Sequence, residues 1–138
     1  MHATVVERYY DRYSLATNPG VSYLHHPSGV TVVVSAEALP CQVVAVDFGS
    51  HKKPGGALRL QAETRLCTLR LADGTERVLR AGVRGFLAEV NNTLRDQPDL
   101  VRTAPENQGY LAILTSAPGQ RRPPEFASLK PCKQVSLF

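Results

Sequence analysis

Tryptophan is absent from this sequence of 138 residues, and so is any apolar stretch near the roughly 20 residues that a membrane-spanning helix needs. The apolar runs are short, as in residues 30–34, where Thr31 interrupts the valines. The first residues include Glu7 and Asp11 and contain no apolar segment of the kind found in secretory signals. We therefore expect a soluble intracellular protein rather than a membrane or secreted one.

Cysteine and histidine are too few and too scattered for a disulfide framework or a metal site. The three cysteines have no CxxC spacing: Cys41, Cys67 and Cys132. The four histidines are His2, His25, His26 and His51. The adjacent pair would point to opposite faces of a strand and could not chelate one ion together. Nucleotide-binding and hydrolase motifs are also missing. The sequence therefore predicts no metal, no cofactor and no enzymatic activity.

Short segments typical of β-strands recur along the chain. Hydrophobic residues make up 43% of it and charged residues 20%, so one compact domain with an apolar core can form. Residues 30–35 are rich in β-branched side chains, and residues 66–71 alternate apolar with polar ones. The expected strands are 21–26, 30–35, 43–48, 66–71, 75–80, 86–90 and 109–114. This pattern indicates a small β-barrel or sandwich.

Two short helices and one tight turn are expected beside the strands. Residues 5–15 place valine and tyrosine side chains at near-helical spacing, which predicts a helix with an aromatic face. Residues 94–102 allow a turn and a short helix, with Pro98 near its start. The pair Asp73-Gly74 favours a type I′ hairpin turn, whose two central residues both need positive φ.

Positive charge is concentrated in two segments of a chain whose net charge is +4. Residues 51–84 carry eight Lys or Arg against three acids, and residues 115–138 carry four against one. The second segment is also rich in proline, which predicts a basic tail with at most one helical turn near residues 125–129. Such asymmetry can attract an acidic protein such as actin or another cytoskeletal or axonemal protein. Direct nucleic-acid binding is not expected, because no basic motif interleaved with aromatics is present.

Four cations are the leading candidates for contact with a protein partner: Lys52, Lys53, Arg121 and Arg122. They lie in segments rich in proline and glycine, where no core requires them. The competing surface is the N-terminal face with Tyr9, Tyr10 and Tyr13. These tyrosines could anchor an interface or pack on the barrel as a flap, and the sequence leaves both interpretations open.

An ordered series in residues 83–114 resembles the C-terminal half of the glycine cleavage system H protein. The matching features, in chain order, are Gly85, Glu89-Val90-Asn91, Leu94, Pro98, Leu100-Val101 and Gly109-Tyr110-Leu111-Ala112. The resemblance implies a mainly β, biotinyl/lipoyl-like barrel-sandwich hybrid of the single-hybrid-motif type, with short helices. In such a fold, Gly85 would follow a bend where strands cross closely.

H proteins carry a lipoyl group on a lysine at a hairpin tip. The family's spacing, counted back from Gly85, places Gly74 at that position. No lysine occurs between Lys53 and Lys130, so the amide that holds a lipoyl group cannot form at this tip. We therefore expect a lipoyl-like domain without its lipoyl lysine, rather than a carrier.

A second resemblance, to the Abitram (Simiate, actin-binding transcription modulator) family, spans residues 5–114. It is carried by VERYYDRY near the N-terminus, the hairpin at 23–35, the Asp73-Gly74 turn, VRGFLAEVN and GYLAI. It implies a non-enzymatic, actin-associated protein with cytoskeletal and nuclear, transcription-modulating roles, located in the cytoplasm and nucleus.

The expected organisation has three parts. An N-terminal helical or extended flap occupies 1–20, an H-protein-like barrel-sandwich domain occupies 21–114, and a basic Pro-rich tail occupies 115–138. The tail departs from the family, whose members continue into a charged, helix-forming C-terminus. Two alternatives remain: a small structural subunit of a large assembly, such as the axoneme of a cilium or flagellum, and a degenerate protein of the lipoyl-carrier type.

Overall fold

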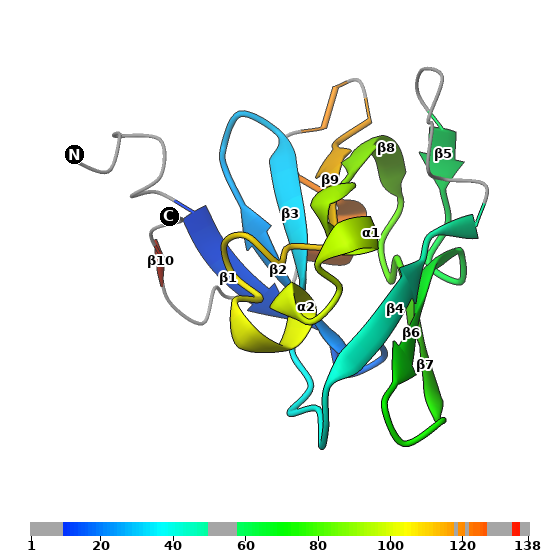
Figure 1. Cartoon of the computed structure of the whole chain (residues 1–138). Helices are drawn as coiled ribbons and strands as arrows, with labels where there is room; N and C mark the ends of the chain where they lie inside the picture. Colours follow the sequence, from blue (N-terminus) through cyan, green and yellow to red (C-terminus); the bar gives the residue numbers. More distant parts are fainter. Residues whose placement is uncertain (1–9, 50–57, 118, 121, 127–133, 136–138) are drawn as a thin grey trace.

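The computed structural model describes residues 10–49, 58–117, 119–120, 122–126 and 134–135, which form two β-sheets and three short helical segments (Figure 1). A seven-stranded sheet has the order β10-β1-β2-β3-β9-β8-β5, and a three-stranded sheet has the order β4-β6-β7. The strands are β1 (Tyr10–Ser14), β2 (Val21–His25), β3 (Val30–Ser35), β4 (Val43–Asp47), β5 (Leu58–Leu60), β6 (Arg65–Leu71), β7 (Glu76–Arg80), β8 (Gly85–Val90), β9 (Ala112–Thr115) and β10 (Gln134–Val135). The helical segments are α1 (Thr93–Asp96), α2 (Leu100–Thr103) and the 3-10 helix η3 (Pro124–Phe126).

The β2–β3 hairpin forms the middle of the larger sheet. Tyr23 lies opposite Val33, and Leu24 lies opposite Val32. Because successive side chains of a strand point to opposite faces, Tyr23 and Val33 enter the main core. Leu24 and Val32 form a second apolar cluster with Val34 on the other face. Both faces of the hairpin are buried, which accounts for the continuous valine run in β3.

The main core lies between the two sheets. Leu69 and Leu71 of β6 alternate inward as the sequence predicts, and both are at most 1% exposed. A register shift against β7 between Arg65 and Cys67 lets consecutive residues, Leu66 and Cys67, both be buried. The mainly β architecture with short helices that the sequence predicts is therefore confirmed.

The helix expected over residues 5–15 is wrong for the part that the structure describes. Tyr10–Ser14 is strand β1, paired antiparallel with β2 so that Tyr13 lies opposite Tyr23. The same residues satisfy a period of two as well as a helical period, because Tyr13 and Leu15 are buried while Ser14 between them is exposed. Pairing with β2 decides between the two periods. Residues 5–9 lie outside the described part.

The C-terminal segment contributes to the core. Ser116 donates its backbone N–H to the carbonyl oxygen of Gly29, and Phe126 of η3 is fully buried. The Phe126 ring stacks on Tyr13, with ring centroids 4.3 Å apart and planes inclined by 6°. The core thus takes Tyr13, Leu15 and Phe126 from outside the range 21–114. The three-part division of the chain stays a prediction.

The hairpin between β6 and β7 differs from the expected type I′ turn. Gly74 donates its N–H to the Leu71 carbonyl oxygen at 3.0 Å, so the two central residues of the turn are Ala72 and Asp73. Leu71 donates to the Thr75 carbonyl oxygen at 2.9 Å and closes a three-residue loop. Gly74 follows the turn with φ of 89°, a value that favours glycine.

Three further details depart from the sequence-based expectation. Strand β5 was not expected, and β9 covers Ala112–Thr115 rather than residues 109–114. Residues 94–102 contain parts of two one-turn helices, α1 and α2, rather than one. In the part of the chain that the structure describes, no helix is long and apolar enough to cross a membrane.

Candidate functional site

The hairpin tip at residues 72–74 is exposed and carries a carboxylate rather than an amine. Asp73 accepts hydrogen bonds from the Thr75 hydroxyl at 2.6 Å and from the Thr75 backbone N–H at 2.9 Å. These two bonds stabilise the charged carboxylate and lower the pKa of Asp73 below its usual value. The tip is thus ordered by its own side chain and offers no nucleophilic nitrogen.

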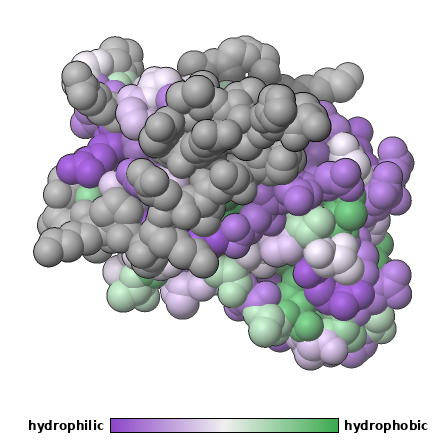
Figure 2. All heavy atoms as spheres, turned by 90° about the vertical axis from the view of Figure 1, so that its left-hand side faces the viewer, coloured by the Kyte–Doolittle hydropathy of each residue, from purple (hydrophilic) through white to green (hydrophobic). Residues whose placement is uncertain are grey.

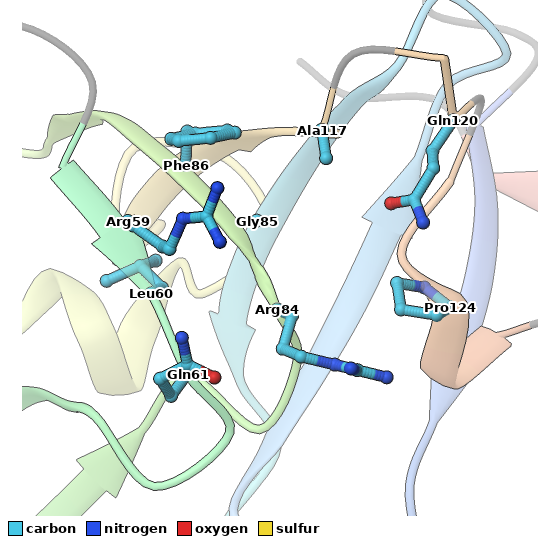
Figure 3. Close-up of a pocket in the computed structure, with 9 residues that line it drawn as sticks. All are labelled: Arg59, Leu60, Gln61, Arg84, Gly85, Phe86, Ala117, Gln120 and Pro124. Carbon is cyan, nitrogen blue, oxygen red and sulfur yellow. The ribbon is translucent and has the colours of Figure 1, made fainter.

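A hollow of about 170 Å³ lies between the β5–β8 pair and residues 117–124 (Figure 3). Arg59 and Gln61 reach it from β5 and the following residue, and Arg84 and Phe86 from the start of β8. The opposite wall contains Ala117, Gln120 and Pro124. The walls therefore combine two arginines and two glutamine amides with apolar residues, and they come from three separate stretches of the chain.

Gly85 lies between Arg84 and Phe86 along the inner side of this hollow. A Cβ at this position would lie 2.9 Å from the Thr115 carbonyl oxygen, and Thr115 lies opposite Phe86 on β9. The close approach of β8 to β9 therefore requires glycine, as expected for a residue that follows a bend. Gly85 thus separates two other residues of the hollow, Arg84 and Phe86, along the chain.

The two arginines of the hollow differ in whether they are paired with a carboxylate. Arg84 donates its Nε to Glu125 at 3.0 Å and its backbone N–H to the same carboxylate at 3.2 Å. The Arg59 guanidinium carbon lies 5.4 Å from the centre of the Phe86 ring, a cation–π distance. Among the described residues, no carboxylate forms an ion pair with Arg59. Arg59 thus presents an uncompensated charge to the hollow.

The two basic segments that the sequence predicts as a binding surface lie close, along the sequence, to residues that line this hollow. Lys52 and Lys53 lie outside the described residues, in the segment that ends where β5 begins at Leu58. Arg121 also lies outside them, between two residues of the hollow wall, Gln120 and Pro124. Arg122 is exposed and donates a hydrogen bond of 3.1 Å to the Tyr13 hydroxyl.

Sequence reasoning did not single out Arg59 or Arg84. Both belong to the basic stretch at 51–84, but that stretch also contains arginines on the β6–β7 hairpin, far along the chain from the tail. Nothing in the sequence indicates that residues 59 and 84 meet residues 117–124. Only the pairing of β5 with β8, which places Arg59 opposite Phe86, brings these positions together.

The tyrosine face that competes with the basic surface is largely occupied. Tyr13 is 2% exposed and packs in the core, so its side chain is not available at the surface of this structure. Tyr10 is half-buried and packs on the second apolar cluster, with its ring centroid 5.4 Å from that of His26. Tyr9 lies outside the described residues. In Figure 2, which faces the β1 side, hydrophilic residues separate the small hydrophobic groups among the coloured atoms.

The two described histidines have hydrogen-bond partners, and the Cys67 thiol is buried. His25 is buried, and its Nδ1 lies 2.9 Å from the Thr31 hydroxyl, while the His26 Nδ1 lies 2.7 Å from the Ser28 hydroxyl. Burial raises the pKa of Cys67 to about 12, so its thiol stays protonated and unreactive. Among the described residues, no group of three or more possible ligands could hold a metal ion.

Comparison with known proteins gives one coherent set of relatives. No family model matches the chain. An uncharacterised protein of Caenorhabditis elegans is 45% identical, over 99% of this chain and 96% of its own length. The Abitram protein of Dictyostelium discoideum is 29% identical, over 80% of this chain and 74% of its own length. The Abitram protein of Drosophila melanogaster is 31% identical, over 82% of this chain and 60% of its own length.

The fold also has a counterpart among solved structures. A crystal structure of a glycine cleavage system H protein from Mycobacterium marinum matches with a TM-score of 0.61 and 22% identity, over 78% of this chain and 84% of that one. This similarity confirms the predicted barrel-sandwich hybrid.

Proposed function

The chain belongs to the Abitram family, with a core like that of the glycine cleavage system H protein, and from this premise we propose that it is a non-enzymatic binding protein for actin. In this role the barrel-sandwich is a rigid scaffold. Its surface, rather than a prosthetic group, carries the function. We further propose that the protein acts in both the cytoplasm and the nucleus, where it modulates transcription.

The observation that carries this proposal is the basic hollow beside β5. The segment with Lys52 and Lys53 leads directly into β5, and Arg121 lies between two residues of the hollow wall. Along the sequence these cations lie close to residues that line the hollow, which itself contains Arg59. A surface of this kind attracts an acidic protein face and accelerates its association.

The hairpin tip supports a binding role over a carrier role. A lipoyl group needs a lysine amine, and the exposed tip offers Ala72, Asp73 and Gly74 instead. The fold of a carrier is therefore retained while its attachment chemistry is missing. A binding function is consistent with both features.

Co-sedimentation with filamentous actin tests the proposal. We expect the purified full-length chain to pellet with actin in a saturable manner and to stay in the supernatant without it. Binding should weaken as salt rises, because the Debye length falls to about 8 Å at physiological ionic strength. A chain that stays in the supernatant at every actin concentration, at low salt, would rule out direct binding to filaments.

Fractionation of a native extract by size separates this proposal from its main alternative. A chain that elutes near its monomer mass, or with actin, supports the proposed role. A chain found only within a large assembly without actin would favour a structural subunit, for example of a ciliary axoneme.

A further inference from the structure

We infer that the hollow beside β5 binds an acidic side chain of the protein partner, with Arg59 as the residue that recognises its carboxylate. This inference rests on the proposed binding function and identifies the point of contact. It is carried by three features of the described residues: a carboxylate already bound on one wall, a second guanidinium without a carboxylate, and the size of the space between them.

The chain's own Glu125, which is not itself a lining residue, shows how Arg84 on one wall of the hollow binds a carboxylate. Its Oε2 accepts from the Arg84 Nε at 3.0 Å, and its Oε1 accepts from the Arg84 backbone N–H at 3.2 Å. The Glu125 side chain is 21% exposed, whereas that of Arg84 is 60% exposed. Arg84 is therefore neutralised within the chain and is not the group that meets a partner.

Arg59 is placed to bind a second carboxylate. Its guanidinium lies over the Phe86 ring at 5.4 Å, which restricts the side chain and directs it along the hollow (Figure 3). A restricted side chain loses less entropy on binding than a free one. The planar guanidinium also donates two parallel hydrogen bonds to a carboxylate, a geometry that an ammonium group does not provide.

The rest of the hollow suits one acidic side chain. The side-chain amides of Gln61 and Gln120 border it from opposite sides (Figure 3). The volume of about 170 Å³ accommodates a single side chain, not an extended ligand.

A protein carboxylate fits this arrangement better than a nucleic acid. Nucleic-acid affinity grows with the number of phosphates that lysine and arginine neutralise, and it needs a track of free cations. In the described hollow, Glu125 already compensates one of the two arginines. A single free guanidinium flanked by two amides matches one carboxylate.

Binding of a short fluorescein-labelled oligoglutamate peptide to the full-length chain, followed by anisotropy at low salt, tests the inference. We expect saturable binding of oligoglutamate and none of oligoglutamine. Arg59→Gln should weaken binding about tenfold, the loss of one charge-assisted contact. The matched control is Arg95→Gln, which removes an exposed cation from α1 and should change affinity by less than about twofold. Melting temperatures should be unchanged in both variants.

A residue-resolved measurement locates the contact independently of any variant. In NMR titrations with the same peptide, the backbone amides of Gly85 and Phe86 should shift, whereas those of Ala72 and Asp73 at the hairpin tip should not. Equal weakening by Arg59→Gln and Arg95→Gln, or shifts confined to another surface, would overturn the inference. So would tighter, Arg59-dependent binding of a single-stranded oligonucleotide than of oligoglutamate.

The two proposals can fail separately. If the chain binds actin and Arg59→Gln binds it equally well, the hollow is not the contact, and the actin proposal stands. If the chain binds oligoglutamate through Arg59 but not actin, the acidic-partner site stands, and actin is the wrong partner.

Discussion

A close backbone contact determines which residue can occupy position 85 of the barrel. At Gly85, a Cβ would lie 2.9 Å from the Thr115 carbonyl oxygen, and a backbone atom cannot move aside as a flexible side chain can. We predict that Gly85→Val lowers the free energy of unfolding by about 1–3 kcal/mol. Urea denaturation measures this change.

The matched control for Gly85→Val is Ala88→Val on the same strand. Ala88 is exposed, so its added methyl groups should change the free energy of unfolding by no more than about 0.5 kcal/mol. Equal stability of Gly85→Val and the parent would show that β8 and β9 can separate at no cost, contrary to the packing described here.

Asp99 joins the short helices to the smaller sheet. Its Oδ1 accepts from the Val43 backbone N–H at 2.9 Å, and its carboxylate binds the Arg102 guanidinium at 2.6 and 2.9 Å. The bonds to Arg102, and then the bond to Val43, lower the pKa of Asp99. A lowered pKa stabilises the fold above the ordinary carboxyl value, and this stability is lost as the pH falls through the lowered value.

We therefore predict that Asp99→Asn costs about 1 kcal/mol near neutral pH, because a charge-assisted contact at a partly exposed site is lost. The difference between parent and variant should shrink as the pH is lowered below the ordinary carboxyl range. Chemical denaturation at a series of pH values measures it. A difference that stays constant down to strongly acidic pH would contradict the assigned role of the carboxylate.

At the scale of elements, the main apolar contact of the C-terminal segment is made by Phe126. Phe126 is fully buried and stacks on Tyr13, while the residues that precede it in the sequence are mostly polar or proline. We predict that Phe126→Ala destabilises the fold by about 3–5 kcal/mol, the usual cost of emptying a buried aromatic site.

The control for Phe126→Ala is Val78→Ala on β7, which truncates a side chain that is 49% exposed. Val78→Ala should lower the free energy of unfolding by much less than Phe126→Ala does in the same thermal or urea unfolding experiment. If both variants unfold alike, residues 117–126 are not part of the cooperative unit, and the account of the C-terminal segment is wrong.

The sequence predicts the central strands because their signals are local. The β-branched run of β3 and the alternation in β6 each need only their own residues to be recognised. Strand β1 could not be assigned in this way, since Tyr10 and Tyr13 fit both a helical and a strand period until β2 is present to pair with them. The burial of Phe126 could not be predicted, because a single apolar residue among prolines forms no hydrophobic periodicity.

The candidate site was predictable only in part, for a related reason. An excess of charge in two segments can be counted along the chain, and it led to Lys52, Lys53, Arg121 and Arg122. The sequence does not reveal that Arg59 lacks a carboxylate partner among the described residues, because that depends on which arginine Glu125 pairs with. That choice is made by tertiary packing between residues 41 positions apart.

At the scale of the whole molecule, an H-protein-like fold without a lysine at its hairpin tip predicts that no lipoyl group is attached. The protein, purified from a host that has lipoylation enzymes, should show its unmodified intact mass. The expected reason is that the hairpin tip at 72–74 offers no amine. The mass of a lipoyl group on Lys52, Lys53 or any other lysine would contradict the assignment as a binding protein.

The central claim is that the molecule binds its partner through the basic end beside β5. A fourfold alanine variant at Lys52, Lys53, Arg121 and Arg122, called the rim variant, removes the four candidate cations of the two basic segments. A matched fourfold alanine variant at Arg70, Arg77, Arg80 and Arg95 removes the same charge elsewhere. The rim variant should melt close to the parent, apart from the small loss of the Arg122 bond to Tyr13. The matched variant should lose slightly more stability, because it removes the ion pairs of Arg70 with Glu76 and of Arg77 with Glu37.

The most direct test is the affinity of the parent and both fourfold variants for filamentous actin, at low and moderate salt. We predict that the rim variant binds at least about tenfold more weakly than the parent, with the larger difference at low salt, and that the matched variant binds nearly as the parent does. A folded rim variant that binds as tightly as the parent would contradict the account, and it would direct attention to the surface around Tyr10 instead.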